Sequence, residues 1–273
     1  MKTVPAPNVV AVTQWSEHPR ERGRSLVRIQ SAALDYVLSP SSTSERWRWG
    51  LNYIHGRSMQ YPKTQTLFKR TQPYKQPKKI IIGDYAHEAF GNIKLWRVQE
   101  KIDGMNIRVY FEGDSIKIMG RGEDSQIPPS LQSFFDSSLI LENYKLLCLA
   151  DPRINNIQLF GEGFGGKIQK GRIYRNDPAF ILFDTLLNGR WGTREEVGHI
   201  AICLGLEQPH DYGLKTEEEI VDIIQNKNTG RYNFDHDRKY IFEGVIARTD
   251  PYLFDRDGNR IMFKLKVEDF KNV

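Results

Sequence analysis

The chain has 273 residues, of which 39% are hydrophobic, and a formal net charge of +5. This length can bury one sizeable core or two modest ones, and no apolar run approaches the roughly 20 residues that a membrane-spanning helix needs. The N-terminus lacks the apolar stretch of a secretory signal, and two cysteines are too few for a disulfide framework or a metal cluster, so we expect a protein of the reducing cytoplasm.

The first 58 residues differ in kind from the rest. They are rich in Ser and Arg and carry eight basic and four acidic residues, whereas the remainder carries 31 and 30. Their one apolar pattern at helical spacing is formed by Leu26, Ile29, Ala33 and Val37. We expect residues 1–58 to be a poorly ordered extension, and we hypothesise that Met59 is the natural start. Peptides from Gly50 or earlier in the native protein would contradict this hypothesis.

From residue 59 to residue 273 the pattern predicts a single α+β domain. Alternating and short apolar runs predict strands over residues 95–101, 106–111, 115–119, 157–162, 179–187, 240–249 and 260–267. Helical spacing predicts helices over residues 128–149, 193–204 and 216–226. Thr216, followed by Glu219, has the capping-box pattern that opens the last helix.

Because this domain is nearly neutral, contact with a polynucleotide would depend on local basic clusters. The candidates are Lys75, Lys78 and Lys79, and also Lys167, Lys170 and Arg172. A solvated protein face explains such clusters equally well.

Five short blocks follow one another in an order that nucleotidyl transfer through a lysine would require. They are Lys101-Ile102-Asp103-Gly104, Gly161-Glu162-Gly163, Phe180-Ile181-Leu182-Phe183-Asp184, Glu243-Gly244-Val245-Ile246-Ala247-Arg248 and Lys264-Leu265-Lys266. Each block alone is weak, because a few fixed residues recur by chance. Together they supply one candidate nucleophile, two spaced acids, an aromatic residue and a closing pair of lysines.

Lys101 is the candidate nucleophile. A lysine that attacks a nucleotide α-phosphate must first lose its proton, and neighbouring cations with partial burial favour that loss. Candidates for these cations are Lys264, Lys266 and Arg121. The leaving pyrophosphate needs a magnesium ion as well as basic side chains, and the ion needs one or two carboxylates.

Glu162 and Glu243 are the candidate metal ligands, and the glycines beside them, Gly161, Gly163 and Gly244, would let the backbone approach a nucleotide closely.

Other residues in the blocks allow two interpretations. Phe183 could stack on a purine or belong to the ordinary core. Asp103 lies two residues after Lys101, so it would share that strand face and contact a ribose hydroxyl or a metal-bound water, or it is a simple turn residue. Glu100 and Asp184 are equally ambiguous.

The ordered blocks resemble the nucleotidyltransferase motifs of the superfamily that contains polynucleotide ligases and messenger-RNA capping enzymes. Within it, residues from about 61 to 270 resemble the ATP-dependent RNA ligases, particularly small phage and bacterial members. The stretches Tyr61–Arg70 and Phe160–Gly171 carry much of this likeness. Asn106 also agrees with that branch, because DNA ligases and capping enzymes usually have arginine there. Met105 departs from the usual Thr or Ser.

The resemblance implies an ATP-grasp-like ligase adenylation domain, of α+β class, with antiparallel sheets flanked by helices. It implies that Lys101 forms the lysyl-adenylate, that Phe183 stacks on adenine and that Glu100 reads the adenine edge. The other implied nucleotide contacts are Asp103 at the ribose, Gly104, Asn106, Arg121 at the phosphates and RNA end, Glu162 at the ribose or metal, Glu243 at the metal, and Lys264 and Lys266 at the triphosphate.

The implied cofactors are ATP and Mg²⁺, which Mn²⁺ could replace, and the implied partners are RNA ends, nicked or single-stranded. AMP would pass from ATP to Lys101 and then to a 5′-phosphate, and a 3′-hydroxyl would displace it. We see no C-terminal accessory domain after Lys266, so adenylation is better supported than sealing. No kinase or phosphatase block is visible, so separate end-healing enzymes would prepare the ends.

Three alternatives stay open. The protein could be an ATP-dependent DNA ligase, a capping-type guanylyltransferase that uses GTP, or a catalytically silent nucleic-acid-binding module of the same fold. A preference for DNA strands at nicked duplexes would identify the DNA ligase. Covalent labelling by GTP would identify the guanylyltransferase, and nucleic-acid binding without any covalent nucleotide would identify the silent module.

Overall fold

The computed structural model describes residues 59–71, 80–112, 114–122, 124–170, 173–226, 229–230 and 240–270, all of which belong to one compact unit. The predicted N-terminal extension, its helical pattern at residues 26–37 and the basic cluster at residues 75–79 lie outside the described residues.

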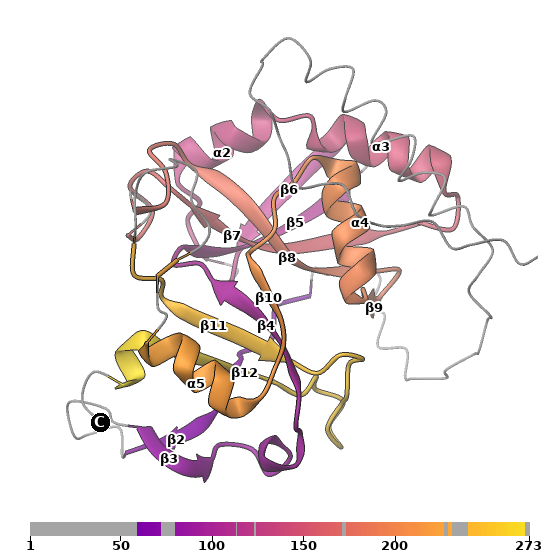
Figure 1. The fold of residues 1–273 in the computed structure, drawn as a ribbon. Coiled ribbons are helices and arrows are strands. Elements are labelled where there is room, and N and C mark those ends of the chain that lie inside the picture. Colours follow the sequence, from indigo (N-terminus) through magenta and orange to yellow (C-terminus); the bar gives the residue numbers. More distant parts are fainter. Residues whose placement is uncertain are drawn as a thin grey trace, which may run out of the picture. The chain divides into compact units, whose positions relative to one another are not determined.

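Two five-stranded sheets dominate the described residues (Figure 1). The first sheet has the order β1 (Gln65–Thr66), β12 (Met262–Lys266), β11 (Gly244–Arg248), β4 (Trp96–Lys101) and β10 (Asp211–Lys215). The second sheet has the order β6 (Ser115–Gly120), β5 (Met105–Glu112), β7 (Ile157–Phe164), β8 (Ala179–Leu187) and β9 (Arg190–Trp191). Strands β2 (Phe68–Arg70) and β3 (Ile80–Tyr85) form a further pair. The strand pairs within the two large sheets are antiparallel apart from β1 with β12, which confirms the predicted α+β class with antiparallel sheets.

Helices cover the outer faces of the sheets. They are α2 (Pro129–Asp136), α3 (Ile140–Ala150), α4 (Arg194–Leu204) and α5 (Glu217–Gln225), with short 3₁₀ turns η1 (Phe90–Asn92) and η3 (Val267–Phe270). Figure 1 shows α2, α3 and α4 on the side of the second sheet and α5 beside the first. No helix in the described part of the chain is long and apolar enough to cross a membrane. Cys148 is half-buried, Cys203 is buried, and both are free thiols.

The helix predicted over residues 128–149 is wrong in one respect, because it is two helices. The Ser137 hydroxyl donates to the Ser133 carbonyl at 2.8 Å, and the Ser138 hydroxyl donates to the Phe135 carbonyl at 2.8 Å. Serine side chains that bond the preceding turn in this way compete with the helical backbone bonds. The chain therefore leaves the helix after Asp136 and starts again at Ile140.

Both other predicted helices are confirmed, and each begins with a capping box. In α5 the Thr216 hydroxyl accepts from the Glu219 N–H at 3.3 Å, and the Glu219 carboxylate accepts from the Thr216 N–H at 2.9 Å. Thr193 and Glu196 repeat the pattern at the start of α4. These reciprocal bonds satisfy backbone donors that the first turn leaves free, so each helix starts where its threonine stands.

The outer face of the first sheet packs in the core against α5. Alternation along the strands puts one set of side chains there, namely Trp96, Val98, Val245, Ala247, Phe263 and Leu265. The helix contributes Ile220, Ile223 and Ile224 to the same cluster. Since every second residue of β4, β11 and β12 is used in this way, the residues between them face the second sheet.

Strand β10 is an element that the sequence analysis did not predict. Gly213 within it has a φ of +79°, and its pairing with β4 shifts register between Asp211 and Gly213. Its residues are half-buried or exposed, so they lack the apolar alternation that reveals a strand.

Candidate active site

The link between β4 and β5 carries the chain from the first sheet to the second. Strand β4 ends at Lys101 and β5 begins at Met105. A Cβ atom on Gly104 would lie 2.4 Å from the Gly163 carbonyl oxygen, so only glycine fits where this link passes β7. Lys101 consequently stands at the junction of the two sheets.

Strand register makes the inner face of the first sheet a grid of three rows. Cross-strand neighbours on β4, β11 and β12 form the rows Arg97, Arg248 and Met262; Gln99, Ile246 and Lys264; and Lys101, Gly244 and Lys266. Because β-strands rise about 3.3 Å per residue, successive rows are roughly 7 Å apart. One end of the grid is therefore rich in lysine, and the other carries arginine and apolar side chains.

The second sheet supplies the opposite wall. Asn106 on β5 lies beside Glu162 on β7, which lies beside Ile181 on β8. Between β7 and β8 the register shifts, so that Leu182 pairs with Gly161 and Asp184 pairs with Phe160 while Phe183 has no partner. Such bulges re-aim side chains, and Phe183 faces the first sheet half-buried rather than in the core.

These two walls enclose a pocket of about 350 Å³. Nine residues predicted from the sequence line it, namely Glu100, Lys101, Gly104, Asn106, Arg121, Glu162, Phe183, Lys264 and Lys266. Asp103 and Glu243 stand beside Lys101, outside the lining. The lining also contains Tyr61, Gln99, Ile246, Arg248 and Met262, which the motif blocks did not single out as site residues.

Lys101 is held by a carboxylate. Its Nζ lies 2.5 Å from Glu243 Oε2, and Lys266 Nζ lies 2.8 Å from Glu243 Oε1. Glu243 thus bridges two ammonium groups, one of which, Lys266, is a cation that the sequence analysis expected near Lys101. Burial, followed by the positive charges of Lys266 and Lys101, lowers the pKa of Lys264. Arg121 is exposed at the rim.

Glu162 is a carboxyl group in a poorly hydrated position. Burial raises its pKa to about 8, the charge of Lys101 opposes this rise, and the charges of Glu243 and Asp103 add to it. Burial and Glu243 likewise raise the pKa of Asp103. The charge of Glu243 thus disfavours the charged forms of Glu162 and Asp103, and a bound cation would relieve that repulsion.

The carboxylates of the pocket suit a divalent ion that is also bound by oxygens from outside the protein. Within the described residues, no three His, Cys, Asp or Glu side chains lie close enough together to hold a metal by themselves. Glu162 and Glu243 offer carboxylate oxygens, and Mg²⁺ is commonly bound through one or two carboxylates together with water and phosphate oxygens. The predicted pair thus fits the ion only with a nucleotide present.

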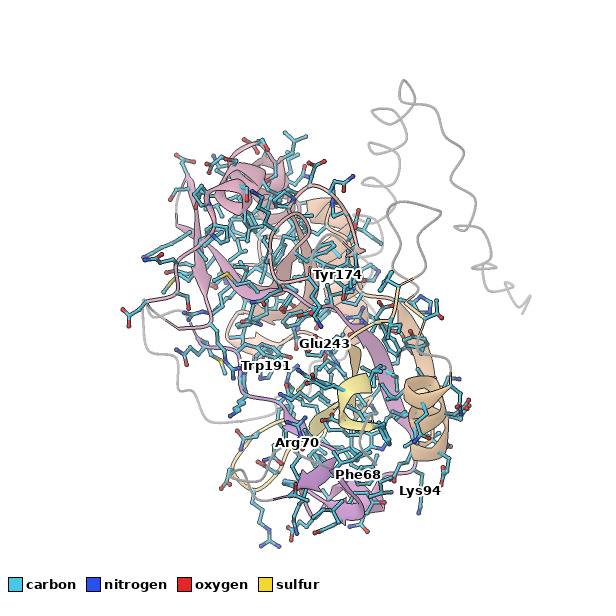
Figure 2. All side chains as sticks on the ribbon, turned by 90° about the vertical axis from the view of Figure 1, so that its left-hand side faces the viewer. Phe68, Arg70, Lys94, Tyr174, Trp191 and Glu243 are labelled. Carbon is cyan, nitrogen blue, oxygen red and sulfur yellow. The ribbon has the colours of Figure 1, made fainter. Side chains whose placement is uncertain are left out.

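Two tyrosines hold the residues on either side of Lys101. The Tyr174 hydroxyl accepts from the Asp103 N–H at 2.9 Å, and the Tyr240 hydroxyl donates to Glu100 Oε1 at 2.6 Å. The two rings meet edge to face, 4.9 Å apart. Figure 2 shows Tyr174 and Glu243 at mid-height, between the helices at the top and β2 and β3 at the bottom. No sequence motif pointed to these tyrosines.

Two predicted roles change with this geometry. The Glu100 side chain alternates away from Gln99 and Lys101, is 1% exposed and accepts from Tyr240, so its carboxylate faces the core rather than the grid. Cβ atoms on Gly161 and Gly244 would lie 2.3 Å from the Ile181 carbonyl and 2.1 Å from the Leu265 carbonyl. Those glycines therefore permit close strand packing, not the approach of a nucleotide.

Asp184, which the sequence left ambiguous, is the centre of a buried ion cluster. It is fully buried and lies 2.7 Å from Arg260 and 3.5 Å from Arg248. The Tyr61 hydroxyl donates to the same carboxylate at 2.9 Å, and the Tyr61 ring meets Phe183 edge to face at 5.0 Å. The cluster thus fixes the apolar end of the pocket.

Comparisons with known proteins give a match to one family model and to several solved structures. Residues 94–266 match the family model described as RNA ligase. A search of curated proteins finds no match. Among solved structures, a variant of Naegleria gruberi RNA ligase with ATP and Mn is similar at 17% identity and a TM-score of 0.49, over 76% of this chain and 61% of that chain. The same enzyme with PPi is similar at 20% identity and a TM-score of 0.45, over 66% of this chain and 52% of that chain. The chain thus spans little more than half the length of the structures it matches.

Proposed function

Since the chain belongs to the RNA ligase family, we propose that it is an ATP-dependent RNA ligase that joins a 5′-phosphate RNA end to a 3′-hydroxyl end. The observation that carries this proposal is the position of Lys101, at the lysine-rich end of a pocket whose other end holds Phe183. A pocket of about 350 Å³ that has lysines at one end and the apolar side chains of Phe183, Ile246 and Met262 in its lining suits a nucleotide.

In the first step, Lys101 Nζ would lose a proton and form a P–N bond to the α-phosphorus of ATP. The P–O bond to pyrophosphate would break, and pyrophosphate would leave with the electron pair. The Glu243 carboxylate lies 2.5 Å from Nζ and can accept the proton. Lys264 and Lys266 both lie on β12, two strands from Lys101, where they would neutralise phosphate charge.

Glu162 and Glu243 would hold the divalent ion, which supplies further neutralisation of the phosphates when bound. Phe183 and Ile246 would contact the faces of the adenine, and Asn106 and Asp103 would approach the ribose. Arg121, exposed at the rim, would meet the RNA end.

In the later steps, a 5′-phosphate oxygen of RNA would take AMP from Lys101, and a 3′-hydroxyl would then displace AMP to form the phosphodiester. Exposed Lys167 and Lys170 would contact RNA phosphates. Ends of other chemistry would need separate end-healing enzymes before this protein could use them.

The test is covalent labelling of the full chain with α-labelled ATP and magnesium. We expect label on the denatured wild-type protein, none on Lys101→Ala, and none in the presence of a chelator. Lys69→Ala is the matched control, because Lys69 pairs with Asp84 on the surface and leaves the pocket intact. Label on Lys101→Ala would overturn the choice of nucleophile.

The substrate is tested next, with unlabelled ATP and a panel of RNA and DNA ends. Sealing of RNA 3′-hydroxyl ends but not DNA ends supports the proposal. Labelling by GTP instead of ATP would identify a guanylyltransferase, and RNA binding without any label would identify a silent module.

A further inference from the structure

Gln99 is a buried amide in the wall of the pocket. It lies in the middle of β4, one row of the grid from Lys101, and its side chain is 1% exposed. Its Oε1 accepts from Arg248 Nη2 at 2.9 Å. Its Nε2 has no hydrogen-bond partner among the described residues.

Arg248 determines which way the amide points. A guanidinium group has donors only, so it requires the oxygen of Gln99 and excludes its nitrogen. Arg248 is itself 3% exposed and lies 3.5 Å from Asp184, so it cannot turn away into solvent. The Gln99 NH₂ group is consequently turned away from Arg248, in a residue that lines the pocket.

The neighbours of Gln99 describe the shape of its ligand. Ile246 is its cross-strand partner, and Phe183 lines the pocket from the opposite wall. A flat group between these two apolar side chains would present its edge to the amide. A buried donor without an acceptor is costly, and a ligand that brings an acceptor removes that cost.

We propose that Gln99 reads the purine of the bound nucleotide by donating a hydrogen bond from Nε2 to a ring nitrogen. This inference rests on the proposed function, because it takes ATP as the ligand. Adenine has three ring nitrogens with a free lone pair that the sugar does not occupy, N1, N3 and N7, whereas its amino group can only donate. Gln99 would thereby be a base-binding residue as well as part of the wall.

The experiment compares ATP with its 1-deaza, 3-deaza and 7-deaza analogues in binding to the full chain by calorimetry. For the wild type, we expect one analogue to bind about tenfold more weakly than ATP, which is the typical effect of one lost hydrogen bond. The Gln99→Glu variant keeps an oxygen for Arg248 but loses the donor. It should bind ATP at least tenfold more weakly and should no longer distinguish that analogue from ATP.

Gln225→Glu is the matched control, because Gln225 is exposed at the end of α5 and should retain the full discrimination. Equal binding of all three analogues to the wild type would overturn the inference, as would unchanged discrimination in Gln99→Glu. If Gln99→Glu does not fold, the binding of ATP and the three analogues is compared between the wild type and Gln99→Met, which also lacks the donor. If either result contradicts the role of Gln99, the ligase proposal still stands as long as ATP labels Lys101. The labelling experiment tests that proposal separately, because it does not depend on the deaza analogues.

Discussion

At the scale of single residues, the site brings together two carboxyl groups whose surroundings differ. Glu243 contacts two ammonium groups directly, whereas Glu162 has a pKa of about 8 because burial disfavours its charged form. Glu162 therefore carries a proton near neutral pH until a cation arrives. Binding of a divalent ion to this pocket should release that proton.

Glu162→Gln tests this protonation through stability. The ordinary glutamate pKa is 4.5, so between about pH 4.5 and pH 8 the folded protein holds a proton that the unfolded chain has lost. Stability from this group is thus complete below pH 4.5 and declines as pH rises through 8, by at most about 1.4 kcal/mol per pH unit. As pH rises across that window, the free energy of unfolding of the variant should therefore increase relative to that of the wild type. Urea unfolding at successive pH values measures this difference. Parallel pH profiles for the two proteins would contradict the assignment.

Tyr174→Phe tests whether the turn after Lys101 must be held in place. The change removes only the oxygen that accepts from the Asp103 N–H. Since one such bond is worth about 1 kcal/mol, we expect the single-turnover rate of Lys101 labelling to fall about fivefold at saturating ATP, with the ATP affinity unchanged. Tyr85→Phe is the control, because its hydroxyl bonds Glu217 outside the pocket. A wild-type rate in Tyr174→Phe would mean that Asp103 needs no such support.

At the scale of elements, the pairing of β7 with β8 decides what enters the pocket. The register shift there leaves Phe183 unpaired and places Asp184 opposite Phe160. Two glycines on β7 allow its neighbours to come close, since a Cβ on Gly163 would meet Leu131 of α2 at 2.5 Å. Strand β7 thus serves as the packing surface for a helix and two strands at once.

Replacing glycines with alanine should have opposite effects on two elements. Gly161→Ala would put a Cβ 2.3 Å from both the Ile181 carbonyl and the Phe180 ring, so we expect a loss of about 3 kcal/mol. Gly198→Ala lies within α4, where the nearest atom is 3.8 Å away, and should stabilise by up to about 1 kcal/mol. Urea unfolding gives the change in the free energy of unfolding for each variant. Equal changes in the two variants would mean that β7 and β8 can move apart without cost.

At the scale of the whole described unit, the two sheets are joined by charge as well as by the link at Gly104. Asp184 comes from the second sheet, Arg248 comes from the first, and Arg260 precedes β12. Tyr61 adds a fourth segment to the same cluster. The pocket is therefore the space between two layers that a buried carboxylate ties together.

Asp184→Asn should weaken the joint between the sheets. The change leaves two buried guanidinium groups without their carboxylate, and breaking a buried pair in this way costs about 3–5 kcal/mol. Asp84→Asn removes a surface pair with Lys69 and should cost less than about 1 kcal/mol. Denaturant unfolding compares the two. A small loss in Asp184→Asn would show that packing alone holds the sheets together.

Much of the fold and part of the site could be predicted because the signals are local. Alternation marks β4, β11 and β12, and a threonine three residues before a glutamate marks the start of α4 and α5. The blocks that contain Lys101, Glu162 and Lys264 could be found for the same reason, since each lies on a strand with a fixed spacing. Strand β10 could not be predicted because its pairing with β4 is non-local and its residues do not alternate between apolar and polar.

The sequence by itself determined the family, the α+β class and the candidates Lys101, Glu162, Glu243, Lys264 and Lys266, because short-range spacing carries that information. Only the tertiary structure decided that Tyr174, Tyr240 and Arg248 support the site. Their hydrogen bonds to Asp103, Glu100 and Gln99 span 71, 140 and 149 residues of sequence. A side chain's partner at such separations depends on strand order and register, which arise from packing the whole core and leave no pattern in any short stretch of chain.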